Sequence, residues 1–230
     1  MFNWFDHLCA LILLVIIPVM SLKNEQLDQD MVDSLPPKKH LFYTNGLMLI
    51  IGALLVMTSW NISDRPWHDL GFAWPVKDIY ISYLILKACF FYLGDIVYGL
   101  SDKKKYAKKI REISFIIPLN IAEFKHYIFL ALAAGLCEEI IFRGFLITYL
   151  KHVFSGIQYS DFWAVIIPAI SFSISHIYQG WAAVLKIIIL SITLGFIFLY
   201  SGSLLYVILI HILIDLISGW ISVIESRRQT

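Results

Sequence analysis

The chain has few charged residues for its length. Of its 230 residues, 15% are charged and 59% are hydrophobic, and the mean hydropathy is +0.75. These values lie well outside the range of soluble globular proteins. They predict an all-α, polytopic membrane helix bundle. Because each span takes about 20 residues, the length leaves room for about seven transmembrane helices and no second soluble domain.

Other absences narrow the class further. The net charge is only +1, and the one dense basic run lies beside an apolar segment, so no nucleic-acid partner is expected. Cys9, Cys89 and Cys137 form no CxxC pair and lie in apolar segments, which argues against a disulfide framework or a thiolate metal site. No internal repeat is present. We therefore expect one membrane domain with no metal and no other cofactor.

Apolar stretches give the expected helices. They cover about residues 8–21, 41–59, 79–100, 127–150, 162–177, 182–200 and 204–224. The first stretch has no basic residue before it, so it should remain as an anchor and not be cleaved as a signal peptide. The apolar segment 113–124 is too short to span before Lys125, so we expect an interfacial or re-entrant piece there.

Positive charges predict the orientation. The run KKKYAKKIR at 103–111 should stay in the cytoplasm. Counting spans from this run places the N-terminus outside and the C-terminus in the cytoplasm. Two other basic groups then fall on the cytoplasmic side as well, namely Lys23, Lys38 and Lys39 in the first loop, and Arg227 and Arg228 at the C-terminus.

Ionisable residues interrupt the last four spans. They are Glu138, Glu139, Arg143, His176, Lys186, His211 and Asp215. Lys186 is close enough to a helix end to extend its amine to the interface. If Glu138, Glu139 and Arg143 faced lipid, their transfer into the membrane would together cost on the order of 10 kcal/mol. These side chains are therefore expected to face each other inside the bundle.

The sequence CEEIIFRGF contains the first of these groups. Glu139 and Arg143 are four residues apart and share a helix face, so they can pair. Glu138 is rotated by about 100° and has no local cation, which suits it to proton transfer. An interhelical polar clamp made of all three side chains is the alternative.

Two more groups follow at the same spacing. Phe172 precedes His176 by four residues in FSISH, and His211 precedes Asp215 by four in HILID. Each pair shares a helix face, and Asp215 could hold His211 in one tautomer. A carboxylate base, two imidazoles and a charge-stabilising group are together the components of a hydrolytic site.

The ordered motifs EEIIFR, FSISH and GSLLYVILIHILID resemble the EExxxR, FxxxH and HxxxN/D pattern of the CAAX-protease and bacteriocin-processing (CPBP) family. This family consists of glutamic intramembrane endopeptidases, and the resemblance covers about residues 127–224. It implies a four-helix catalytic core at 113–230, preceded at 1–112 by N-terminal transmembrane helices and the basic loop.

The resemblance also implies roles. Glu138 and His176 would activate water, while Glu139, Arg143 and Phe172 would support them. His211 and Asp215 would stabilise the oxyanion. Several family members carry Asn at the last position, which can donate a hydrogen bond, whereas an ionised Asp215 cannot. Asp215 must therefore either be protonated, which burial favours, or act indirectly by orienting His211, and we expect the indirect role.

The expected function is cleavage of a prenylated or other membrane-associated peptide or protein. The lipid bilayer is the second expected partner, and the oligomeric state is left open.

Other classes of protein are alternatives to this expected function. A zinc peptidase would need a ligand motif such as HExxH, which is absent. An aspartic protease would need Asp95 and Asp215 together, but YLGD departs from the GxGD pattern. A rhomboid-type serine protease would need GxSG, which is also absent. The alternative from another class is a non-catalytic membrane scaffold, immunity or regulatory protein, or a proton-relaying transporter.

Overall fold

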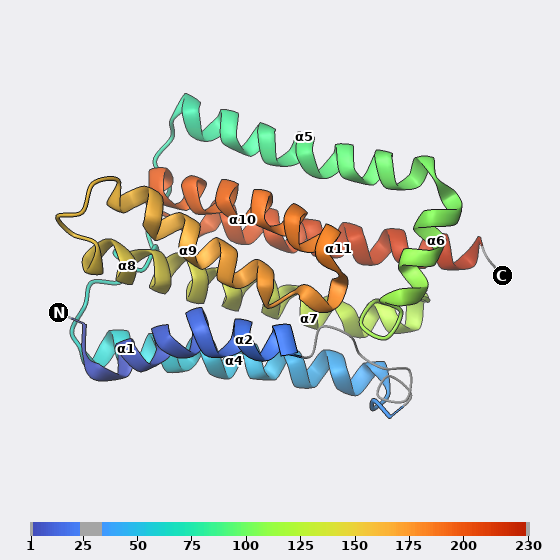
Figure 1. Ribbon diagram of the computed structural model, residues 1–230, viewed down its shortest axis with the longest axis horizontal. Helices are drawn as coiled ribbons and strands as arrows, with labels where there is room; N and C mark the ends of the chain where they lie inside the picture. Colours follow the sequence, from blue (N-terminus) through green and yellow to red (C-terminus); the bar gives the residue numbers. More distant parts are fainter. Residues whose placement is uncertain (1, 24–33, 229–230) are drawn as a thin grey trace.

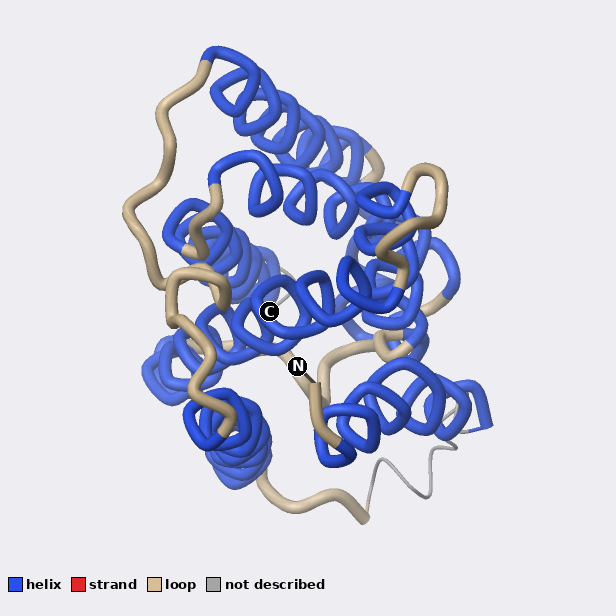
Figure 2. The backbone as a smooth tube through the Cα atoms, turned by 90° about the vertical axis from the view of Figure 1, so that its left-hand side faces the viewer, coloured by secondary structure: helices blue, strands red, loops and turns tan. Residues whose placement is uncertain are grey.

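The protein is a bundle of long helices. A computed structural model describes residues 2–23 and 34–228, and every regular element within these ranges is helical. The long helices run along a common axis, with the loops at the two ends of the bundle (Figures 1 and 2). The all-α prediction is confirmed.

The order of the elements follows the predicted spans closely. In chain order they are α1 (Trp4–Leu11), the π-helix η1 (Ile12–Ile16), α2 (Ile17–Lys23), α4 (Lys38–Ile62), α5 (Ile79–Ser101), α6 (Lys103–Glu112), α7 (Ile121–Glu139), the π-helix η2 (Ile140–Ile147), α8 (Thr148–Val153), α9 (Ser160–Ile174), the 3₁₀ turn η3 (Ile177–Gln179), α10 (Trp181–Ser201) and α11 (Leu205–Arg227).

Five of the helical stretches are long and apolar enough to cross a membrane. They are Trp4–Lys23, Lys38–Ile62, Ile79–Ser101, Trp181–Ser201 and Leu205–Arg227. Two further helices complete the bundle: the stretch from α7 through η2 to α8, which carries the charged motif, and α9, which has only 15 residues. The chain is therefore an integral, multi-pass membrane protein, and the number of helices agrees with the predicted seven or so.

The structure of segment 113–124 differs in part from the predicted interfacial or re-entrant piece. Residues 121–124 already belong to α7, which begins at Ile121 and continues through Lys125. The reason is local, because the Asn120 side chain caps the helix by accepting a hydrogen bond from the Glu123 amide at 2.9 Å. The residues before the cap form turns, and the Ser222 hydroxyl of α11 donates to the Pro118 carbonyl at 2.7 Å.

Lys186 makes a contact that was not predicted. Its amine forms an ion pair with Asp95 of α5. The pair joins α5 to α10, which pack side by side. It also engages Asp95, the residue that an aspartic-protease mechanism would require beside Asp215.

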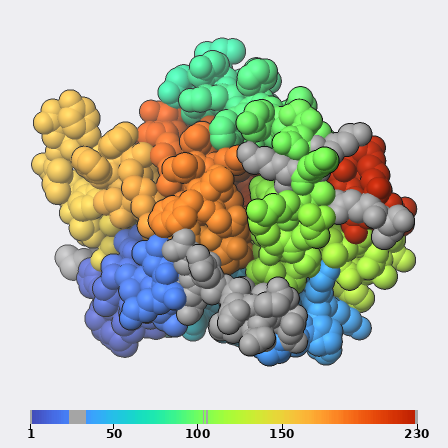
Figure 3. All heavy atoms as spheres, turned by 45° about the vertical axis from the view of Figure 1, so that its right-hand side comes forward, coloured from blue at the N-terminus to red at the C-terminus, as the bar shows by residue number. Residues whose placement is uncertain are grey.

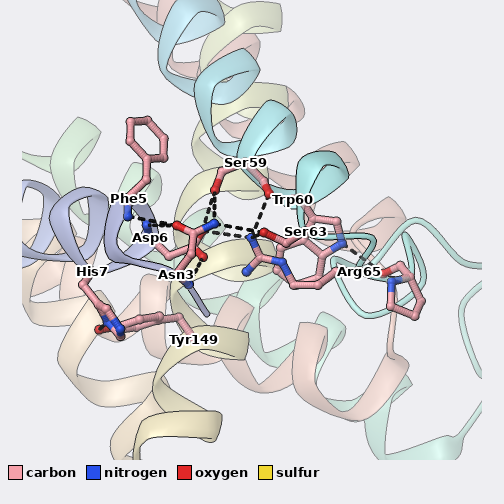
Figure 4. Close-up of polar contacts among 10 residues, drawn as sticks. Asn3, Phe5, Asp6, His7, Ser59, Trp60, Ser63, Arg65 and Tyr149 are labelled. Atoms are coloured by element: carbon pink, nitrogen blue, oxygen red, sulfur yellow. Dashed lines mark hydrogen bonds and ion pairs between the residues drawn. The ribbon is translucent and has the colours of Figure 1, made fainter. Parts of the chain in front are cut away.

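The first helix is joined to α4 by buried polar contacts (Figure 4). Asp6, 0% exposed, accepts hydrogen bonds from the Ser59 hydroxyl at 2.8 Å and from Arg65 at 2.9 Å. The Arg65 guanidinium lies between the rings of Phe2 and Trp60, at 4.7 and 4.4 Å from their centroids. Breaking a buried pair of this kind costs about 3 to 5 kcal/mol, so the first helix is an integral part of the fold.

Helix α7 lies at the centre of the bundle, packed against α4 on one side and α11 on another. The short helix α6 crosses one end of the bundle, beside the end of α11 (Figures 1 and 3). The start of α4, with Lys38 and Lys39, and the end of α11, with Arg227, lie at this same end (Figure 1). The polar motifs of α7, α9 and α11 lie between the two ends.

Candidate active site

The site is centred on Glu139, whose side chain is 0% exposed. One of its oxygens, Oε1, accepts from Arg143 Nη1 at 2.9 Å, so the predicted pair within the motif is present. The same oxygen lies 2.7 Å from His211 Nδ1. Because a carboxylate can only accept, the imidazole donates from Nδ1. Glu139 therefore links its own helix to α11.

Glu138 and Asp215 lie on the other side of the His211 ring. Nε2 of His211 is 3.6 Å from the nearest Glu138 oxygen and 3.7 Å from the nearest Asp215 oxygen. These separations are longer than a hydrogen bond. The side chains are 14% and 27% exposed, whereas that of Glu139 is fully enclosed. Glu138 is thus the more accessible of the two adjacent glutamates.

Asp215 does not make the short contact with the His211 ring. The contact that orients His211 comes from Glu139, at 2.7 Å, and not from Asp215, at 3.7 Å. The physical reason is the close approach of α11 to α7, which places the His211 ring over Glu139. Asp215 instead lies with Glu138 at the Nε2 edge of the ring.

His176 lies beyond the end of α9, in the turn that leads to η3. The prediction that it shares a continuous helix face with Phe172 is therefore only approximate. Its Nδ1 donates to the Phe172 carbonyl at 2.8 Å, one of the last carbonyls of α9, which have no partner within the helix. In the neutral imidazole, Nε2 is then a proton acceptor.

Phe172 connects the separate parts of the site. Its ring centroid is 4.6 Å from the His176 ring and 6.3 Å from the His211 ring. The Arg143 guanidinium carbon is 5.0 Å from the same centroid. Phe172 itself is only 6% exposed. Its ring therefore holds the two imidazoles and the arginine in fixed relative positions, and all the residues predicted from the motifs belong to one cluster.

Two contributors were not predicted from the sequence. The Ser191 hydroxyl of α10 accepts from Arg143 Nη2 at 3.0 Å, which brings another helix to the site. The π-helix η2 begins directly after Glu139, and all of its residues are buried. π-Helical segments occur often at functional sites, because they rotate the side chains that follow relative to an α-helix. An isolated serine in an apolar helix is a weak signal, and periodicity alone does not reveal a π-helix.

Gly135 explains how His211 reaches Glu139. A Cβ at this position would lie 2.4 Å from Ile212 Cγ1 and 3.0 Å from the Ile212 amide nitrogen. The buried face of α7 around it is made of Ala131, Ala133, Ala134 and Cys137. Small residues let membrane helices approach closely. This stripe was the signal in the sequence that could have identified the contact with α11.

We expect Gly135→Ala to lower both stability and activity. The added methyl group must push α11 away from α7, which costs about 1 to 3 kcal/mol and moves His211 off Glu139. Gly94→Ala is the matched control, because a Cβ there meets nothing within 4 Å. Melting temperature and turnover of both variants in one detergent check this. Equal behaviour of the two variants would show that close packing at Gly135 does not matter.

Comparison with known families gives one match. Residues 120–217 match the family model of type II CAAX prenyl endopeptidases, Rce1-like. Comparison with curated proteins and with solved structures gave no significant match. The matched range begins just before α7 and ends within α11, so it contains the EEIIFR, FSISH and HILID motifs.

This range therefore resembles a family of prenyl endopeptidases. It includes Glu138, Glu139, Arg143, His176 and His211, which the fold brings into one cluster. The match to an endopeptidase family and the helices long and apolar enough to span a bilayer together support a membrane protein of the hydrolase class. Over residues 120–217, the chain is similar to the Rce1-like, type II CAAX prenyl endopeptidase family.

Proposed function

We propose that the protein is an intramembrane endopeptidase of the glutamic type, in which Glu138 and His176 activate a water molecule. The observation that carries the proposal is the asymmetry between the two glutamates. Glu139 is enclosed and bonded to both Arg143 and His211, while Glu138 is partly accessible and makes no hydrogen bond with the described residues. A general base must be free to accept a proton, and Glu138 meets this requirement.

The reaction is a hydrolysis with conventional proton transfers. Glu138 takes a proton from water as the water oxygen bonds to the scissile carbonyl carbon, and the acceptor nitrogen of His176 helps to position that water. The carbonyl oxygen becomes an oxyanion beside His211. The carbon–nitrogen bond then breaks, and the proton held by Glu138 passes to the leaving amine. Each turnover consumes one water molecule and restores Glu138.

The substrate class follows from the position of the site. The cluster lies within the bundle, between the end that carries α6 and the opposite end (Figure 1). A substrate must therefore enter the bilayer region, as a peptide with a lipid chain or an apolar segment can. We propose that the end carrying α6 and the C-terminus faces the cytoplasm, because positive charge is retained on that side.

The proposal is tested with purified protein in liposomes and a panel of peptides of one sequence with and without a prenyl group. Cleavage of at least one member, at a position mapped by mass spectrometry, is the expected result. A folded protein that binds these peptides and cleaves none would favour the alternative, a non-catalytic membrane protein of the same family.

Chelators should leave the activity unchanged, because the proposed mechanism uses a glutamate and imidazoles where a zinc peptidase uses a metal. Turnover is measured before and after dialysis against a strong chelator, with and without added zinc. In the described ranges, no group of three or more His, Cys, Asp or Glu residues is arranged to hold a metal ion. Loss of activity on chelation and its return with zinc would contradict the mechanism.

A further inference from the structure

The site contains more carboxylates than free hydrogen-bond donors. Arg143 directs Nη1 to Glu139 and Nη2 to Ser191. His211 directs Nδ1 to Glu139, and His176 directs Nδ1 to the Phe172 carbonyl. Asp215, where several family members carry Asn, cannot donate when ionised. Nε2 of His211 faces Glu138 and Asp215 at 3.6 and 3.7 Å. Because Nδ1 already donates to Glu139, Nε2 can donate to an oxyanion only when the ring is an imidazolium.

A tyrosine next to the site has a hydroxyl that can donate. Tyr178 belongs to η3, two residues after His176, and the two rings lie 5.9 Å apart at an interplanar angle of 33°. The ring contact places Tyr178 beside the imidazole that is proposed to position the water. Tyr178 is 37% exposed, so a substrate can reach its side chain.

The neighbouring residue favours donation from this hydroxyl. The Gln179 amide donates to the Tyr178 oxygen at 3.2 Å. The oxygen then acts as an acceptor while its proton stays available, and accepting a bond strengthens the bond that the same hydroxyl donates. Gly180, with φ of 88°, follows directly and ends η3 in a conformation that favours glycine. The turn therefore fixes the backbone that carries Tyr178.

We propose that Tyr178 is the second oxyanion donor of the site, which binds the carbonyl oxygen of the scissile bond together with His211. This inference rests on the proposed peptidase function and adds a residue outside the three motifs. It supplies the hydrogen bond that an Asn at position 215 could have donated. In the tetrahedral intermediate, the hydroxyl donates to the oxyanion and keeps its own proton, so the proton balance of the reaction is unchanged.

Tyr127 is the competing tyrosine. It belongs to α7, the helix that carries Glu138. Its ring, however, is packed against Gly219, where a Cβ would lie 2.5 Å from Tyr127 Cε1, and lies 5.4 Å from the Phe42 ring. These contacts give Tyr127 a packing role between α4, α7 and α11. It also lacks a neighbour that donates to its oxygen among the described residues.

Tyr178→Phe should lower kcat about 10²- to 10³-fold with little change in KM, which is the usual cost of losing one oxyanion donor. Tyr149→Phe is the matched control, because it removes a hydroxyl that is bonded to His7 at 2.7 Å and belongs to none of the three motifs. Its kcat should stay within about twofold of the wild type, and both variants should keep the wild-type melting temperature.

A second measurement separates transition-state binding from packing. A peptide phosphonate, with tetrahedral phosphorus in place of the scissile carbonyl, should bind Tyr178→Phe more weakly by about the factor lost in kcat, because both report binding of the tetrahedral state.

The outcomes separate this inference from the proposed function. If the wild type cleaves peptide and Glu138→Gln does not, but Tyr178→Phe keeps full kcat, only the tyrosine assignment is overturned. A loss confined to Tyr127→Phe would assign the donor to Tyr127 instead. A wild type without any turnover would overturn the proposed function and this inference together.

Discussion

Glu138→Gln should remove nearly all turnover and leave the protein folded. Glutamine has almost the same shape as glutamate but cannot take a proton from water, so the loss should be about 10²- to 10⁴-fold, as for other general bases. Glu138 makes no hydrogen bond with the described residues, and its nearest cation is His211 Nε2 at 3.6 Å. Its replacement therefore breaks no short buried contact, and the melting temperature should change little.

Single-turnover rates, peptide affinity and melting temperature of this variant in one detergent provide the check. Glu112→Gln is a suitable control for the substitution itself, since Glu112 is exposed on α6 and faces Lys108 at 3.7 Å. It should behave like the wild type in all three measurements, because an exposed ion pair contributes little. A Glu138→Gln variant with wild-type turnover would exclude this residue as the base.

Glu139→Gln should fail in a different way, by losing stability together with activity. It leaves Arg143 buried with no counter-charge and takes from His211 the carboxylate that orients its ring. Removing one partner of a buried pair costs about 3 to 5 kcal/mol. Arg143 is 2% exposed, so water cannot compensate for the missing charge. Turnover should fall as well, because His211 is no longer fixed beside Glu138.

Arg143→Gln should reproduce this loss from the other side of the pair. Thermal unfolding of the variants at positions 138, 139 and 143 in the same detergent distinguishes the roles. The expected order places Glu138→Gln close to the wild type and the other two well below it. Equal destabilisation by the two glutamate variants would contradict the separation of a catalytic from a supporting glutamate.

Much of the fold could be predicted from the sequence, because its main features are local. Runs of apolar residues give the spans, and the i, i+4 spacing gives the pair of Glu139 with Arg143. The match of residues 120–217 supports the family that the motifs resemble. These features depend only on neighbours along one helix, or on an order of motifs along the chain.

The contacts between helices could not be predicted in the same way. The sequence placed Asp215 as the partner of His211 because the two share a helix face, but Glu139 from α7 makes the short contact. The difference depends on how closely α11 approaches α7, which is set by the glycine at position 135. The contact of Ser191 with Arg143 could not be predicted for a similar reason, since it depends on how α10 packs beside Arg143.

The place of His176 depends on where α9 ends. A span continuing to residue 177 would put this histidine one turn along the helix from Phe172. The helix ends at Ile174, and His176 turns back to satisfy the Phe172 carbonyl. Apolar periodicity does not report the last residue of a helix, so the sequence could identify the histidine but not the hydrogen bond that leaves Nε2 as the acceptor.

The most direct test of the central claim, that Glu138 activates water and does not attack the substrate itself, is a single turnover in ¹⁸O-labelled water, analysed by mass spectrometry of both product and enzyme. A water oxygen that bonds directly to the scissile carbon appears in the new carboxylate of the product. We expect one ¹⁸O atom in the cleaved peptide, none in the enzyme fragment that contains Glu138, and no labelled product from Glu138→Gln. Label in the Glu138 fragment after one turnover, or labelled product from Glu138→Gln at the wild-type rate, would contradict the mechanism.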